Sequence, residues 1–131
     1  MIKHIMLIND DPDELDNIAA LLESINPDCN ILNAYDSDSG IHLLSQFIPE
    51  LVLLKIPMLK EDGFNCLKKI NQAMANYKVP VYAISEILDP TGRLRALMLG
   101  AAGCLRKTAD TKRFAENLAI LLDMESKASM A

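Results

Sequence analysis

The chain alternates short apolar runs with longer segments in which apolar residues recur every three or four positions. The short runs cover residues 5–8, 31–35, 51–54, 79–84 and 104–105. Each run is too short for a helix and is followed by turn-forming residues, so each is predicted to be a strand. The run at 51–54, Leu-Val-Leu-Leu, is apolar at every position, which is typical of a strand buried on both faces of a parallel sheet.

The segments between the runs have the spacing of amphipathic helices. Their apolar stripes are Leu15, Ile18, Ala19, Leu22 and Ile25; Ile41, Leu44 and Ile48; Phe64, Leu67, Ile70 and Met74; Leu94, Leu97 and Met98; and Phe114, Leu118, Leu121 and Leu122. The first helix is expected to begin near Pro12, and the second to be capped by Ser37 or Asp38. The fourth helix is expected to begin after Asp89 and to end at Gly100.

Strand and helix therefore alternate five times, which predicts an α/β fold with a doubly wound, five-stranded parallel sheet covered on both faces. The length of 131 residues suits a single domain. We expect that domain to cover residues 1–123 and the small, polar segment at 124–131 to be a frayed tail.

Composition limits the classes of partner. The net charge of −5 disfavours nucleic acid and anionic membrane surfaces, since both attract a basic face. The apolar runs are too short to span a bilayer, and the first residues lack the apolar core of an export signal, so a cytoplasmic location is expected. The three cysteines and two histidines form no metal-binding pattern.

Lys55 poses a question, because it directly follows the most apolar strand, where an unpaired ammonium would be costly to bury. In a parallel sheet, the residues that follow the strands gather at one edge. Those polar residues are Asn9, Asp10, Asp11, Lys55, Ser85, Glu86 and Lys107. We therefore expect the Lys55 ammonium to pair with Asp10, Asp11 or both.

The order and spacing of several segments resemble the receiver domain of two-component response regulators. The matching segments are IMLINDDPDEL, PELVLLKI, EDG at 61–63, VPVYAIS, LRALMLGAAG and CLRK. The resemblance covers nearly the whole chain. It implies a flavodoxin-like (βα)5 fold with the strand order 2-1-3-4-5.

The resemblance also assigns roles to individual positions. The family's phosphorylation pocket corresponds here to Asn9, Asp10, Asp11, Lys55, Ser85 and Lys107. The magnesium-binding acidic pair falls on Asn9 and Asp10, and the phosphate-accepting aspartate is replaced by Lys55. Ser85 and Cys104 stand at the switch positions, Cys104 in place of an aromatic residue.

These departures imply a degenerate pocket. A lysine cannot form the acyl phosphate that an aspartate forms, and two expected carboxylates are missing. Counting Asp10 and Asp11 against Lys55 and Lys107 gives a pocket near neutrality without a metal. We therefore expect no cofactor, with magnesium binding lost or weak, no metal site and no catalytic residue.

The favoured interpretation is a stand-alone, receiver-like signalling module that is not an enzyme and acts by protein–protein interaction. Its expected partners are a histidine kinase, another response regulator, an output protein or a second copy of the chain. Two alternatives stay open: a small enzyme that forms a Schiff base through Lys55, and a phosphorelay receiver with a non-standard acceptor such as Asp10 or Asp11. A flavin carrier is excluded because the loop NDDPDE would repel phosphate.

Overall fold

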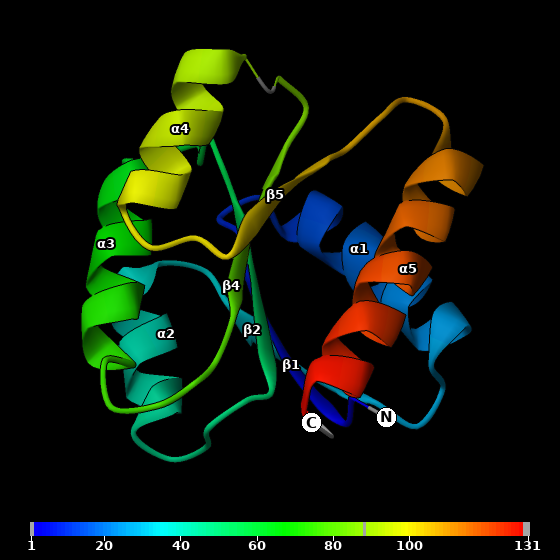
Figure 1. Cartoon of the computed structure of the whole chain (residues 1–131), viewed down its shortest axis with the longest axis horizontal. Coiled ribbons are helices and arrows are strands. Elements are labelled where there is room, and N and C mark those ends of the chain that lie inside the picture. Colours follow the sequence, from blue (N-terminus) through cyan, green and yellow to red (C-terminus); the bar gives the residue numbers. More distant parts are fainter. Residues whose placement is uncertain (1, 88, 130–131) are drawn as a thin grey trace.

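The computed structural model describes residues 2–87 and 89–129, which form a parallel sheet covered by helices on both faces (Figure 1). The strands are β1 (His4–Ile8), β2 (Asn30–Ala34), β3 (Leu51–Lys55), β4 (Val81–Ser85) and β5 (Gly103–Arg106). The helices are α1 (Pro12–Ile25), α2 (Ser37–Leu44), α3 (Gly63–Ala73), α4 (Pro90–Met98) and α5 (Thr111–Ser129). The predicted alternation of strand and helix is confirmed.

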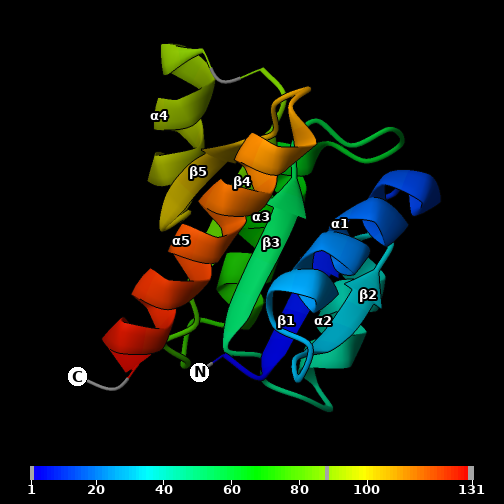
Figure 2. The ribbon, with the colours of Figure 1, turned by 90° about the vertical axis from the view of Figure 1, so that its right-hand side faces the viewer.

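The strand order is β2-β1-β3-β4-β5, as expected, and every neighbouring pair is parallel. The central strand β3 is buried along its whole length and pairs with β1 on one side and β4 on the other. The carboxyl ends of β1, β3, β4 and β5 therefore meet at one edge of the sheet, where their loops lead into the helices (Figure 2).

The two faces of the sheet carry separate cores. Helices α2, α3 and α4 cover one face, and α1 and α5 cover the other (Figure 1). Along β3, Val52 and Leu54 pack in the first core, whereas Leu51 and Leu53 pack in the second. Because side chains alternate along a strand, Lys55 shares the face of Leu51 and Leu53 and points toward α1 and α5.

The stripe expected for the second helix is wrong at two of its three positions, since Ile41 is 36% exposed and of the three only Leu44 is buried. Helix α2 stops at Leu44, and Ile48 lies beyond it with 40% of its surface exposed. The residue after Ile48 is Pro49, which disfavours a helical backbone at the position before it. The helix is capped by Asp36, one residue earlier than expected, and the buried positions of α2 include Gly40.

The stripe expected for the fourth helix is also wrong. Leu94, Leu97 and Met98 are all exposed, and the residue that α4 buries is Ala96. Ala96 belongs to the core on this face of the sheet, whereas the leucines lie on the sides of the helix that no core residue in the described part of the chain covers. The ends of this helix are as expected, since Asp89 caps its start and Gly100 follows it with a φ of 104°.

The C-terminal segment differs from the expected frayed tail, because helix α5 continues to Ser129. Two side-chain contacts hold this extension: Tyr82 of β4 donates a hydrogen bond to Glu125, and Lys127 pairs with Asp123 at 3.0 Å. The last two residues of the expected tail, 130–131, lie outside the described residues. No helix in the described part of the chain combines the length and apolar character needed to cross a membrane.

Candidate functional site

The Lys55 ammonium lies inside the carboxyl edge of the sheet and pairs with Glu14 of helix α1. The distance from Lys55 Nζ to Glu14 Oε1 is 2.6 Å, and the two side chains are 10% and 13% exposed. Glu86, which follows β4, approaches the same ammonium at 3.5 Å. A buried lysine of this kind requires such a partner, because an unpaired charge would be costly to remove from water.

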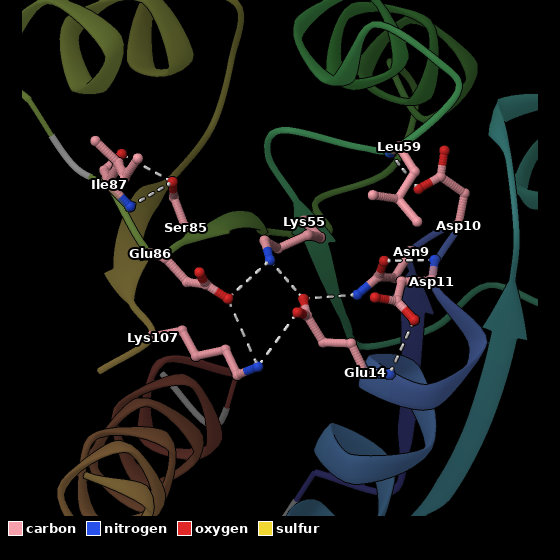
Figure 3. Close-up of polar contacts among 10 residues, drawn as sticks. All are labelled: Asn9, Asp10, Asp11, Glu14, Lys55, Leu59, Ser85, Glu86, Ile87 and Lys107. Atoms are coloured by element: carbon pink, nitrogen blue, oxygen red, sulfur yellow. Dashed lines mark hydrogen bonds and ion pairs between the residues drawn. The ribbon is translucent and has the colours of Figure 1, made fainter. Parts of the chain in front are cut away.

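Lys107 closes the arrangement into a four-membered network. Its Nζ lies 3.3 Å from Glu14 Oε2 and 3.9 Å from Glu86 Oε1. Each carboxylate thus faces both lysines, with Glu14 on the inside and the 58% exposed Glu86 on the outside (Figure 3). Two ammonium and two carboxylate groups leave no net charge in this Lys55 network.

The expected pairing of Lys55 with Asp10 or Asp11 is wrong. Asp10 turns the other way, toward the loop after β3, and accepts hydrogen bonds from the backbone N–H groups of Leu59, Lys60 and Glu61 at 2.6, 2.7 and 3.3 Å. The alternation of side chains along β1 explains this, because Asn9 continues the face of α1 and α5 and the next residue points to the opposite face.

Asp11 acts as a helix cap. It is the N-cap residue of α1, and its carboxylate accepts a hydrogen bond from the backbone N–H of Glu14 at 3.4 Å. Asn9 is buried, and its side-chain amide donates to Glu14 Oε1 at 3.0 Å, while its oxygen accepts from the backbone N–H of Asp11 at 2.9 Å. Asn9 thus supports the glutamate that binds Lys55.

Hydrogen bonds lower the pKa values of the Glu14 and Asp10 carboxyl groups. Burial alone would raise the pKa of Glu14, but hydrogen bonds from Lys55 and Asn9, with the charge of Lys55, hold it below its ordinary value. Burial likewise opposes ionisation of Asp10, and the backbone donors at Leu59 and Lys60 outweigh it and lower its pKa. Both groups are therefore stabilised as carboxylates.

Ser85 and Cys104, the expected switch positions, line the face of the sheet that α3 and α4 cover, opposite to the face of the Lys55 network. The Ser85 hydroxyl donates to the backbone oxygen of Ile87 at 2.8 Å and accepts from its N–H at 3.2 Å, so it is turned toward the loop after β4 (Figure 3). Ser85 and Cys104 both line a small cavity of about 30 Å³ beside Ala96. Burial raises the pKa of the Cys104 thiol, which keeps it neutral.

The oxygen atoms at this edge are a poor match for a magnesium ion, which prefers several free oxygen ligands around it. Both oxygens of Asp10 accept backbone hydrogen bonds, and the Asn9 oxygen accepts one as well. The Lys55 ammonium fills the space beside Glu14. In residues 2–87 and 89–129, no three acidic, histidine or cysteine side chains converge as a metal-ligand set.

Glu14 was not expected at this edge from the sequence, and Glu86 was expected there but not as a partner of Lys55. Glu14 had a recognisable signal, because it stands four residues before Ile18 on the stripe that α1 buries, where an apolar residue is usual. Glu86 follows β4 directly, so its position at the edge could be expected, but its contact with two lysines depends on the fold. Of the expected residues, the structure brings together Asn9, Lys55 and Lys107.

Comparisons with known proteins identify the family to which this fold belongs. The family model of the response regulator receiver domain matches residues 5–119, and the chain therefore belongs to that family. Receiver domains are signalling modules of two-component systems that interact with histidine kinases and other proteins.

Individual relatives are distant. Protein PilH of Pseudomonas aeruginosa is 24% identical over 118 residues, which is 90% of this chain and 96% of PilH. The probable transcriptional regulator ycf27 of Guillardia theta is 26% identical over 101 residues, and the match spans 77% of this chain but only 39% of that relative. A crystal structure of the signal receiver domain of a DNA-binding response regulator from Colwellia psychrerythraea has a TM-score of 0.76 and 26% identity, covering 92% of this chain and 98% of that one.

The hydrogen bonds of Asp10 lead to a testable prediction. Asp10→Ala should speed amide hydrogen exchange at Leu59, Lys60 and Glu61 and lower the free energy of unfolding by about 1–3 kcal/mol, since it removes a charged acceptor from three donors. Hydrogen exchange followed by NMR measures the first effect and urea unfolding the second.

Asp11→Ala is the matched control, because it removes a neighbouring carboxylate that caps α1 instead. It should cost about 1 kcal/mol and leave exchange at residues 59–61 unchanged. Equal acceleration of loop exchange in both variants would contradict the assigned role of Asp10.

Proposed function

We propose that this chain is a receiver module that is not phosphorylated in the conventional way and that acts by binding other proteins. The observation that carries the proposal is the Lys55 ammonium at the end of β3, held 2.6 Å from Glu14. An ion-paired ammonium has no free lone pair with which to attack a phosphoryl donor. It also fills the space in which a metal and a phosphoryl group would have to meet.

We further propose that magnesium binds weakly or not at all and that no metal or cofactor takes part. Support comes from the hydrogen bonds that already engage Asp10 and Asn9, and from the two lysines that neutralise Glu14 and Glu86. A pocket without net charge gives a divalent cation little electrostatic advantage over water.

The partners we propose are proteins of two-component systems: a histidine kinase, another response regulator, an output protein or a second copy of this chain. The chain spans 39% of the relative ycf27 and 96% of PilH, so these relatives differ in what accompanies the receiver domain. Because the network fixes Lys55 and Lys107 together, we propose that binding uses one conformation of the receiver and needs no phosphorylation to create it.

The two alternatives receive less support. A Schiff base through Lys55 requires an amine free to attack a carbonyl carbon, whereas Glu14 and Glu86 both contact this ammonium. Phosphorylation of Asp10 requires a free carboxylate oxygen, and both of its oxygens accept backbone hydrogen bonds. We therefore propose that the chain has no enzymatic activity of its own.

The proposal is tested by incubation with acetyl phosphate and magnesium, followed by intact-mass measurement. We expect no gain of a phosphoryl group in this chain, while a receiver that carries an aspartate acceptor, treated in parallel, is labelled. A phosphorylated Asp10 or Asp11 found by tandem mass spectrometry would favour the non-standard acceptor. A borohydride-trapped adduct at Lys55 after incubation with a carbonyl compound would favour the Schiff-base enzyme.

A further inference from the structure

A polar cavity adjoins the Lys55 network, between the end of β4 and the start of α5. Its volume is about 520 Å³, within the usual range for small-molecule sites. It is lined by Glu86, Arg106, Lys107, Thr108, Ala109 and Thr111. Lys107 belongs to both places, since its ammonium also contacts Glu14 and Glu86.

The charge of this cavity is opposite to that of the whole protein. Glu14 and Glu86 already offset Lys55 and Lys107, so Arg106 adds one uncompensated positive charge here, in a chain whose net charge is −5. The Arg106 guanidinium has no ion-pair or hydrogen-bond partner within the described part of the chain. The cavity therefore offers an unpaired guanidinium next to a lysine whose ammonium lies 3.3 Å from Glu14 and 3.9 Å from Glu86.

A neighbouring groove of about 560 Å³ continues from this cavity between α1 and α5. The two share Lys107, Thr108 and Thr111 as lining residues, while Ala20 and Leu21 add apolar surface to the groove. Together they form a cationic end and an apolar extension, the arrangement that fits a small molecule with an anionic head and an apolar body.

We propose that this cavity binds a small phosphomonoester, with the phosphate between Arg106 and Lys107 and the rest of the ligand in the groove between α1 and α5. A guanidinium forms paired hydrogen bonds with phosphate oxygens, and the ammonium adds a point charge. The Thr111 hydroxyl is available as a further donor, whereas the Thr108 hydroxyl already donates to the backbone oxygen of Asp110 at 3.0 Å.

Binding at this site acts on the Lys55 network through the lysine that both share. A phosphate competes with Glu86 for Lys107, and Glu86 is the more weakly held acid of the network, exposed by 58% and 3.5 Å from Lys55. The ligand therefore weakens the Lys107–Glu86 contact, while Glu86 keeps Lys55 at 3.5 Å and Glu14 keeps its 2.6 Å contact with Lys55. The site is independent of the proposed lack of phosphorylation, because binding here is reversible and transfers no group.

The test is a titration of the whole chain with phenyl phosphate and with inorganic phosphate, followed by NMR of the backbone amides at constant ionic strength. We expect saturable shifts at residues 106–111 with both probes, larger affinity for phenyl phosphate, and no shift with phenol. Phenyl phosphate and inorganic phosphate of equal affinity would overturn the assignment of the groove, and shifts that do not saturate would overturn the site.

Two variants with opposite expected effects sharpen the test. Arg106→Gln should weaken binding about tenfold, by loss of a charge-assisted hydrogen bond, whereas Glu86→Gln should tighten it by removing the competing acid. Arg93→Gln, the same substitution at an exposed position of α4, should leave the affinity unchanged. The site is refuted if Arg93→Gln weakens binding as much as Arg106→Gln, or if Glu86→Gln weakens it.

Discussion

Replacing Lys55 by alanine is expected to lower the free energy of unfolding by about 2–3 kcal/mol. Breaking a buried ion pair by removing one partner typically costs ~3–5 kcal/mol, because the remaining charge is left uncompensated. The cost is smaller here, since Glu14 keeps Lys107 at 3.3 Å and the Asn9 amide at 3.0 Å. Urea unfolding of the two proteins measures the difference.

A double-mutant cycle separates the Lys55–Glu14 pair from loss of packing. Glu14→Gln alone leaves the buried ammonium with only the exposed Glu86, so it should also destabilise. The double variant Lys55→Ala with Glu14→Gln should be less destabilised than the sum of the single variants, by about 1–2 kcal/mol. Lys127→Ala, which breaks the exposed pair with Asp123, is the control and should cost no more than about 0.5 kcal/mol.

Acid adds a second readout of the same pair. The pKa of Glu14 is lowered in the folded chain, so its ionised form stabilises the fold at a pH above the ordinary value of 4.5. That contribution is lost as the pH falls through the lowered pKa. The stability difference between wild type and Lys55→Ala should therefore shrink below that pH. The assigned role of the Lys55–Glu14 pair would be contradicted by a stability difference between wild type and Lys55→Ala that stays constant from neutral to strongly acidic pH. Additive effects of the two single variants in the cycle would contradict it as well.

Restoring an aspartate at position 55 is expected to create a need for magnesium. Lys55→Asp places a carboxylate beside Glu14 and removes its closest cation, so the variant should melt below the wild type in the absence of metal. Added magnesium should raise its melting temperature by about 3–6 °C by binding only the folded state, and should leave the wild type unchanged. Differential scanning calorimetry with and without magnesium measures both shifts.

The strength of this rescue depends on the remaining ligands. Asn9→Asp combined with Lys55→Asp should give a larger magnesium-induced rise in melting temperature than Lys55→Asp alone. The reason is that the added carboxylate at position 9 joins the one at position 55 as a free metal ligand. Lys68→Asp makes the same change of charge on the exposed surface of α3 and should show no magnesium shift. A wild-type melting temperature that rises with magnesium as much as that of Lys55→Asp would contradict the proposed loss of the metal site.

Local patterns in the sequence were sufficient for the architecture. Continuous apolar strands and helical spacing predict five β–α units, and the buried strand at 51–54 is the centre of the sheet. The resemblance to receiver domains adds the strand order. Capping residues predict the helix ends well where a single signal dominates, as at Asp89 and Gly100.

The same patterns fail where packing decides which face of a helix is buried. The leucines of α4 have helical spacing, yet the helix buries Ala96 and leaves Leu94 and Leu97 exposed. Ile48 belongs to a similar stripe, but Pro49 ends the helical pattern before it. Periodicity identifies an apolar face and does not say whether a neighbouring element covers it.

For the site, the sequence by itself determined that charged residues gather at the carboxyl edge of the sheet and that Lys55 stands among them. Only the tertiary structure decided its partner. Asp10 and Asp11 directly follow β1, the strand beside β3, and were therefore the expected partners. However, the alternation of side chains along β1 and β3 turns Asp10 and Lys55 to opposite faces of the sheet. Glu14 meets Lys55 because α1 packs across the face to which the lysine points, a contact between residues 41 positions apart that depends on how the helix docks.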